Sequence, residues 1–301
     1  MKVVTIDVCP ACMSNHTNVV FKPTSQSWER FQLLSTRKYK GCMDSWGDFL
    51  NLQVNQCSLC NHLWHQTQPE FSDLMKMYNS SIPLHDIPVS HYPSQAILAS
   101  MRSLFKLSSR VSNGTPTFLD YGSGRGKWSK AAVIAGFRVW AYEPSVTRSS
   151  ERITDNFVIV NDLEELLGLS FDLVNLEQVL EHTQNPYETL KGLSPYLKVN
   201  SLVRIVVPNV SQSMRKTLWN DFPFPGNSMH VLSPYEHLQG FNGISLKMLL
   251  KRVHFKHLNT IGAWIACPRV MVRFVIGILF PESSGTSVLV TPDFDILSSK
   301  K

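Results

Sequence analysis

The stretch Phe118-Leu119-Asp120-Tyr121-Gly122-Ser123-Gly124-Arg125-Gly126 decides the fold. Its apolar start predicts a β-strand, and its three glycines predict a turn whose backbone takes positive φ and comes close to a ligand. Residues 128–135 (WSKAAVIA) follow as a helix whose first N–H groups face back towards the turn. This order predicts a nucleoside or nucleotide site at the carboxyl end of the strand; an ordinary glycine-rich turn is the alternative.

The rest of the chain alternates between short apolar runs and segments with helical spacing. We expect an α/β fold with a doubly wound, mainly parallel, Rossmann-like sheet of seven strands. Besides 118–121, the predicted strands are 138–142, 157–160, 171–176, 201–207, 255–261 and 286–291. The predicted helices are 71–78, 96–107, 128–135, 163–167, 186–197, 244–252 and 268–280.

Two acidic residues follow the second and third predicted strands. Glu143 ends the second strand about 20 residues after the glycines, where a carboxylate usually accepts the two hydroxyl protons of a ribose. A surface glutamate at a strand end is the alternative. Asp162 opens the helix after the third strand. The spacing Gly-x-Gly-x-Gly, rather than Gly-x-Gly-x-x-Gly, fits a nucleoside without a pyrophosphate and argues against a nicotinamide dehydrogenase.

Four cysteines near the N-terminus form two Cys-x-x-Cys pairs, Cys9/Cys12 and Cys57/Cys60. Such pairs place two thiolates on a tight turn so that both face one tetrahedral ion. We expect a structural zinc in a small β-rich module, because the segment between the pairs shows no long helical period. Accidental cysteines are the alternative, and Cys42 is a possible substitute ligand.

Bulk properties bound the class of protein. The chain has 301 residues, 43% of them hydrophobic and 17% charged, with a net charge of +6 and a pI of about 9.0. These values predict a globular chain and leave nucleic acid, anionic lipid or a phosphorylated substrate open as partners. The sequence shows neither a signal peptide nor an apolar run of about 18 residues, so we expect a cytoplasmic protein without a transmembrane segment.

We divide the chain into a zinc-ribbon-like module (1–68), a connector (69–94) and a catalytic domain (95–301). Residues 210–240 are rich in proline and carry aromatic and histidine side chains without a regular period. A long irregular stretch of this kind is typical of a lid or binding loop, and we expect it to contact the acceptor.

Five segments in order carry a family resemblance: FLDYGSGRG (118–126), AYEPS (141–145), VNDLEEL (160–166), FDLVNLEQVLEHTQNPYETL (171–190) and LVRIVVPN (202–209). Together they resemble class I S-adenosylmethionine-dependent methyltransferases over residues 95–291. The double Cys-x-x-Cys ahead of them is similar to bacterial members with an N-terminal zinc ribbon, many of which act on sugars or polysaccharide precursors.

The resemblance implies a role for each matching position. It implies that Asp120 and the three glycines of the turn hold the methionine part of the cofactor. It also implies that Glu143 binds the ribose and that Asp162 and Leu163 flank the adenine. Residues 178–182 would line the floor where the methyl group is transferred. The complete set of implied cofactor residues is Asp120, Tyr121, Gly122, Ser123, Gly124, Gly126, Glu143, Pro144, Asp162, Leu163 and Gln178.

A hydroxyl or carbon acceptor also needs a general base. His182 is our candidate because it follows a strand end at the cofactor side; a packing or capping histidine is the alternative, and His230 and His237 are weaker candidates. Related O-methyltransferases carry Glu-x-x-Glu-His here and bind a divalent metal. This chain has Gln178 in place of the first glutamate, which argues against a catalytic metal.

The predicted function is methyl transfer from S-adenosylmethionine to a small-molecule or glycan-type acceptor. One alternative is an RNA methyltransferase that uses the zinc ribbon to bind RNA, although the chain lacks an Asn/Asp-Pro-Pro-Tyr/Phe motif. Another is a non-catalytic methyltransferase-like protein, against which the intact glycine turn, Glu143 and Asp162 argue.

Overall fold

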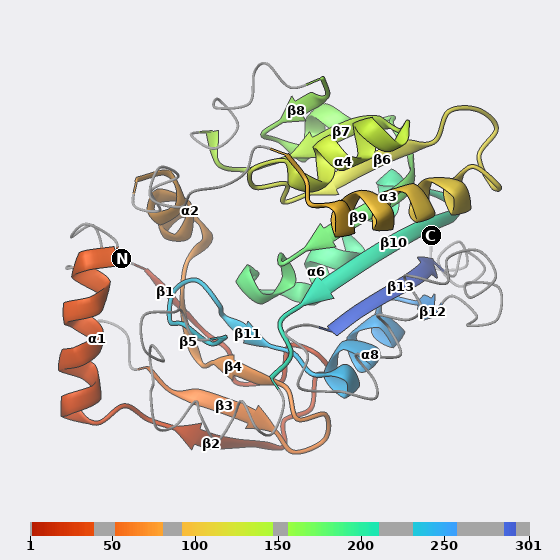
Figure 1. Cartoon of the computed structure of the whole chain (residues 1–301). Helices are drawn as coiled ribbons and strands as arrows, with labels where there is room; N and C mark the ends of the chain where they lie inside the picture. Colours follow the sequence, from red (N-terminus) through yellow and green to blue (C-terminus); the bar gives the residue numbers. More distant parts are fainter. Residues whose placement is uncertain are drawn as a thin grey trace.

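The computed structural model describes residues 2–38, 52–80, 92–146, 156–210, 231–257 and 286–292. Its centre is a seven-stranded sheet with the order β12-β13-β10-β9-β6-β7-β8 (Figure 1). The strands are β6 (Thr117–Tyr121), β7 (Arg138–Tyr142), β8 (Val158–Val160), β9 (Phe171–Glu177), β10 (Leu197–Val207), β12 (Phe255–His257) and β13 (Thr286–Pro292).

The five strands from β8 to β10 run parallel, and β13 pairs antiparallel with both β10 and β12. This arrangement confirms the predicted Rossmann-like, mainly parallel α/β sheet. Successive side chains of a strand point to opposite faces, so Phe118 and Leu119 belong to different apolar clusters. Burial on both faces explains why the central strands are almost continuously apolar.

Helices cover both faces of the large sheet (Figure 1). One face packs against α3 (Gln95–Ser108) and α4 (Lys127–Ala135). The other face packs against α6 (Pro186–Lys191), α8 (Gly243–Arg252) and the short 3-10 helices η2 (Leu163–Leu166), η3 (Leu180–His182) and η4 (Ser194–Tyr196). No described helix is long and apolar enough to cross a membrane.

A second, smaller sheet lies beside the first and has the order β11-β4-β3-β2. The N-terminal strands are β1 (Val3–Thr5), β2 (Thr17–Phe21), β3 (Val54–Cys57), β4 (Leu63–His65) and β5 (Thr67–Pro69), with β1 paired to β5. The outer strand β11 (Gln239–Gly240) lies far from the other three strands in the sequence, and it pairs antiparallel with β4. The two parts of the chain therefore share one sheet.

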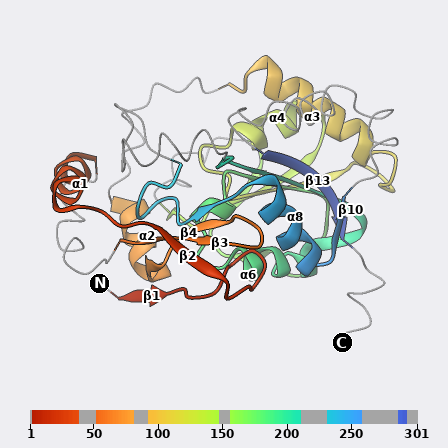
Figure 2. The same ribbon diagram turned by 90° about the horizontal axis from the view of Figure 1, so that it is seen from below.

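Two helices belong to the N-terminal third, α1 (Ser25–Lys38) and α2 (Phe71–Ser80). The expectation of a segment without a long helix between the cysteine pairs is therefore wrong. Phe31 of α1 is buried against Tyr235, Leu74 and Met77, and this packing supports a helix whose own sequence is largely polar. Figure 2 shows α1 at the outer edge of the small sheet, away from α3 and α4.

Two predicted helices are shorter than expected. The helix starting at Pro186 ends at Lys191, and η4 follows before β10 begins at Leu197. Gly192 and Pro195 explain this end, since neither residue favours continuation of an α-helix. Residues 163–166 form a 3-10 helix. The predicted helix 268–280, His230 and Cys42 lie outside the described residues.

Candidate active site

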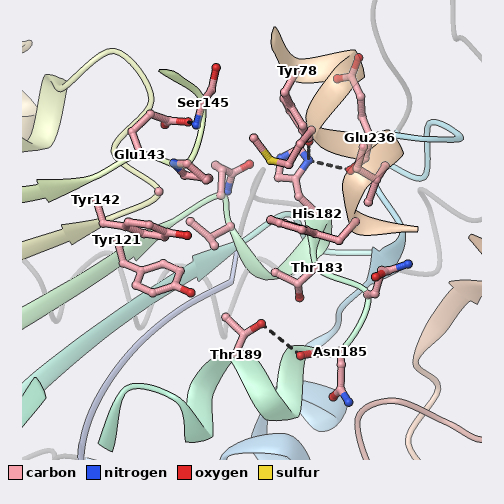
Figure 3. Close-up of a pocket in the computed structure, with 18 of the residues that line it drawn as sticks. Tyr78, Tyr121, Tyr142, Glu143, Ser145, His182, Thr183, Asn185, Thr189 and Glu236 are labelled. Carbon is pink, nitrogen blue, oxygen red and sulfur yellow. Dashed lines mark hydrogen bonds between the residues drawn. The ribbon is translucent and has the colours of Figure 1, made fainter. Parts of the chain in front are cut away.

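A cavity of about 560 Å³ opens at the carboxyl ends of β6, β7 and β9 (Figure 3). Ligands bind at this edge in open parallel sheets. Its walls come from α2, from the ends of three strands, from the segment between β9 and α6, and from Glu236. The lining residues are Phe71, Leu74, Met75, Tyr78, Tyr121, Gly122, Tyr142, Glu143, Pro144, Ser145, Gln178, Val179, His182, Thr183, Gln184, Asn185, Glu188, Thr189 and Glu236.

The glycine turn after β6 has the predicted backbone. Gly122, Gly124 and Gly126 have φ values of 70°, 51° and 71°, the left-handed region that glycine adopts without steric cost. The N–H groups of Gly122 and Ser123 donate to the carbonyl of Tyr142 at 2.9 and 3.0 Å. The turn is therefore fastened to the end of β7, next to the acidic residue predicted for ribose.

Glu143 lines the cavity and is buried. Its Oε2 accepts a hydrogen bond from the N–H of Gly124 at 2.7 Å, and its Oε1 accepts one from the N–H of Ser145 at 3.1 Å. A carboxylate has about four acceptor positions, so the backbone orients this group and leaves acceptor capacity for a ligand's hydroxyl groups.

Asp120 is turned away from the cavity. Its Oδ2 accepts from the Ser129 hydroxyl at 2.6 Å, and its Oδ1 accepts from Nδ2 of Asn175 at 2.8 Å. Nη1 of Arg204 donates to Oδ1 of Asn175 at 2.6 Å, and its guanidinium lies over the ring of Trp128. Asp120 thus anchors a buried polar network across β6, β9 and β10, behind the glycine turn.

Asp162 is exposed and caps η2, where its Oδ1 accepts from the N–H of Glu164 at 3.0 Å. Leu163 packs into the core, and neither residue lines the cavity. Asp162 still acts on the site electrostatically. Burial, and then the charges of Asp162 and Glu143, raise the pKa of Tyr142 to about 12.

His182 lies in the middle of the lining, at the end of η3 (Figure 3). Its Nδ1 lies 2.6 Å from the carbonyl oxygen of Glu236 and 2.8 Å from the hydroxyl of Tyr78. A carbonyl oxygen only accepts hydrogen bonds, so Nδ1 carries the proton in the neutral ring. The lone pair of the imidazole is therefore on Nε2.

Glu181 and His237 lie next to His182. The Glu181 carboxyl is 1% exposed, has no hydrogen-bond partner among the described residues, and has Oε1 3.9 Å from Nε2 of His182. Burial raises its pKa to about 8. The His237 ring packs edge-on against His182 with centroids 4.7 Å apart. One ligand atom from each of the three residues lies within 4.8 Å of the others, a set that could hold a metal ion.

The predicted cofactor residues divide into two groups. Tyr121, Gly122, Glu143, Pro144 and Gln178 line the cavity together with His182. Asp120, Ser123, Gly124, Gly126, Asp162 and Leu163 do not line it, although Gly124 bonds to Glu143. The roles assigned to these residues remain predictions.

The sequence reasoning missed the wall formed by α2. Phe71, Leu74, Met75 and Tyr78 line the cavity from this helix, at the spacing i, i+3, i+4 and i+7 of one helical face. That stripe is visible in the sequence, but we placed the segment in a connector. Because α2 follows β5 directly, the N-terminal third of the chain supplies one side of the cavity.

The four predicted cysteine ligands come together within the N-terminal third of the chain. Sγ of Cys9 lies 3.6 Å from Sγ of Cys60, and Sγ of Cys12 lies 3.5 Å from Sγ of Cys57. All four sulfurs lie within 4.8 Å of one another. Thiolates bound tetrahedrally to zinc at about 2.3 Å would lie about 3.8 Å apart. The observed distances fit such an ion, and they are too long for disulfide bonds.

Hydrogen bonds connect this cysteine cluster to the cavity. Gln239 accepts from Nε2 of His62, which follows Cys60 by two residues, and donates to the carbonyls of Thr183 and Gln184. Nη1 of Arg252, in α8, donates to the carbonyls of Pro10 and Ala11 at 2.8 and 2.9 Å. The cluster therefore supports the segment that lines the cavity.

Comparison with known proteins identifies the class. A family described as a methyltransferase domain matches residues 94–259, more than half of the chain. The chain belongs to this family, and it is an S-adenosylmethionine-dependent methyltransferase. No curated protein matches the sequence.

Several solved structures are similar in part. The plantazolicin methyltransferase BpumL, in complex with SAH, aligns with a TM-score of 0.48 and 14% identity, over 89% of this chain and 100% of its own. The 1,6-didemethyltoxoflavin-N1-methyltransferase of Burkholderia thailandensis aligns with a TM-score of 0.44 and 14% identity, over 92% of this chain and 95% of its own. A SAM-dependent methyltransferase from Archaeoglobus fulgidus aligns with a TM-score of 0.39 and 17% identity, over 63% of this chain and 92% of its own.

Proposed function

We propose that this chain methylates a small-molecule or glycan-type acceptor bound in the cavity, with His182 as the general base. The observation that carries the proposal is the fixed tautomer of His182. Its Nδ1–H is directed to the Glu236 carbonyl, so Nε2 carries the lone pair that would take a proton. A histidine acts as a general base through its unprotonated ring nitrogen, and a hydrogen bond from the other ring nitrogen orients that atom. His182 meets both conditions.

The donor is proposed to lie across the ends of β6 and β7. Glu143 would accept the ribose hydroxyl protons, since both its oxygens are already oriented by backbone N–H groups. The tight glycine turn would pass close to the methionine part, and Asp162 would face the adenine. When bound, the donor supplies a sulfonium methyl group whose sulfur leaves as a neutral thioether.

The protein's own contribution is then alignment and exclusion of water. The α2 wall and the segment 182–189 face each other across the cavity. An acceptor held between them would have its reacting atom near Gln178 and His182, on the line of attack. The Tyr78 hydroxyl, 2.8 Å from Nδ1 of His182, helps to hold the ring in place.

We also propose that Cys9, Cys12, Cys57 and Cys60 bind one structural zinc. Four thiolates complete a tetrahedral site and leave no open position for chemistry. The sulfur distances and the burial of three of the four cysteines support this proposal. The ion would stabilise the sheet to which β11 belongs.

A labelling experiment tests the methyltransferase function. Full-length protein is incubated with trideuteromethyl S-adenosylmethionine and, in separate reactions, with a small-molecule extract or with total RNA of cells that express it. Mass spectrometry records the compounds and the RNA that gain the label. We expect at least one labelled small molecule, and loss of about 100-fold or more of its rate in His182→Gln. The exposed His16→Gln variant is the control. Label in RNA alone, or equal rates in both variants, would contradict the proposal.

A further inference from the structure

The charges that line the cavity restrict the acceptor. We infer that the acceptor presents an amine, and enters as a cation next to an apolar or aromatic body, rather than as a phosphate or carboxylate. The inference rests on the proposed methyl transfer in this cavity and names the substrate class for that site.

Every charged side chain that lines the described part of the cavity is acidic. The lining contains Glu143, Glu188 and Glu236, and among the described residues it contains no lysine or arginine. The chain as a whole has a net charge of +6. Although the chain carries an excess of positive charge, the charged side chains of the described lining are all negative, the opposite of what an anionic ligand would require.

We call the part of the cavity around Glu236 and Tyr78 the acceptor end, because Glu143 is assigned to the donor. Glu143 lies beside the glycine turn, whereas Glu236 lies with Tyr78 on the far side of His182 (Figure 3). Glu236 is buried and its backbone carbonyl fixes His182. Glu188 is exposed on α6, 3.8 Å from Lys191, a pair in which both side chains are more than half exposed. Because water screens this pair and Lys191 compensates its charge, Glu188 contributes less to the negative potential of the site than Glu236 does.

Aromatic groups complete the acceptor end. Phe71 and Tyr78 line the cavity from α2, with Leu74 and Met75 between them. Aromatic faces attract cations, and apolar side chains favour a ring or chain next to the charged group. Carboxylates combined with aromatic faces form a binding surface for an ammonium group, and they would repel a phosphate in a site partly excluded from water.

The chemistry agrees with this choice. An ammonium group must lose a proton before its nitrogen lone pair can attack, and Nε2 of His182 accepts that proton. A nitrogen–carbon bond then forms while the sulfur–carbon bond breaks, and the sulfur keeps the electron pair. The products are the methylated ammonium ion, the neutral thioether and a protonated His182, which returns its proton to solvent.

Three probes with the same ring and different charge test the inference: benzylamine, benzyl alcohol and benzyl phosphate. Their binding to the full-length protein saturated with S-adenosylhomocysteine is measured by ligand-detected NMR. We expect benzylamine to bind most tightly and benzyl phosphate most weakly. Glu236→Gln should weaken benzylamine binding about five- to tenfold and leave benzyl alcohol unchanged. Glu188→Gln should weaken it less, and the remote, exposed Glu29→Gln not at all.

Other outcomes overturn the inference. They are tighter binding of benzyl phosphate than of benzylamine, an equal loss for benzylamine and benzyl alcohol in Glu236→Gln, or no binding by any probe. Because Glu236 is buried, S-adenosylhomocysteine affinity and thermal stability are measured for each variant, and Glu188→Gln provides a second test at an exposed position. If S-adenosylhomocysteine itself fails to bind to the wild-type protein, the proposed function fails, which is a different result.

Discussion

A Cβ atom placed on Gly122 would lie 2.8 Å from Cγ2 of Val179, closer than real Cβ atoms approach. Gly122 belongs to the turn after β6, and Val179 follows β9 just before η3. Valine is stiff at χ1, so it does not rotate away easily. The glycine turn and the segment carrying His182 are therefore packed against each other, with contact at the backbone of Gly122.

This contact predicts a specific double-mutant result. Gly122→Ala should destabilise the protein by about 2 kcal/mol or more, because alanine is strained at positive φ and its Cβ would overlap with the Val179 side chain. Gly124→Ala, which has positive φ and no neighbour within 4 Å, should cost only about 1 kcal/mol. In urea unfolding, Val179→Ala should recover part of the Gly122→Ala loss. Strict additivity of the two changes would show that the contact carries no strain.

The network behind the turn predicts a second result. Asn175→Ala removes both the donor to Asp120 and the acceptor for Arg204. Since these groups lie in or near the core, we expect a loss of about 1–3 kcal/mol in the free energy of unfolding. The exposed Asn18→Ala should change it by less than about 0.5 kcal/mol. Equal effects of the two substitutions would mean that the network adds nothing to stability.

The cysteine cluster predicts one zinc per chain. Elemental analysis should find it in the wild-type protein and in Leu59→Ser, whose side chain is 60% exposed in the same turn. Cys57→Ser should lose the metal and melt more than about 5 °C lower. Because Arg252 and Asn242 donate to carbonyls beside the cysteines, hydrogen exchange should also rise in α8. Full zinc content in Cys57→Ser would contradict the assignment.

Glu181 predicts how stability depends on pH. Burial raises the pKa of its carboxyl from 4.5 to about 8. Between these values the unfolded chain is ionised while the folded chain keeps its proton, so stability falls as pH rises from about 4.5 to 8, by on the order of a few kcal/mol. Urea unfolding at several pH values should show this slope, reduced in Glu181→Gln and kept in the exposed Glu164→Gln. An unchanged slope in Glu181→Gln would assign it to other groups.

Much of the fold could be predicted because local sequence decides it. The glycines at 122, 124 and 126 need positive φ, and the short apolar runs around them are too brief for helices and fit buried parallel strands. Glu143 could be placed beside the turn because the ends of adjacent parallel strands meet at one edge of the sheet. The four cysteines were recognisable from the spacing within each pair.

The remaining features depend on contacts between residues far apart in the sequence. The two-residue strand β11 has no local signature and exists because Gln239 pairs with Trp64 of β4. The polar helix α1 is held by Phe31 packing on Tyr235. The position of α2 as a cavity wall depends on where β5 ends in the folded protein. The apolar pattern of the helix alone does not predict that position.

The most direct test of the central assignment is the binding of S-adenosylmethionine measured by isothermal titration calorimetry. The compared proteins are the wild type, Glu143→Ala, Glu143→Gln and the exposed Glu164→Ala as control. We predict one site in the wild type, unchanged affinity in Glu164→Ala, and at least about tenfold weaker binding in both Glu143 variants. Equal affinity in all four proteins would place the donor elsewhere, and no binding to the wild type would contradict the account.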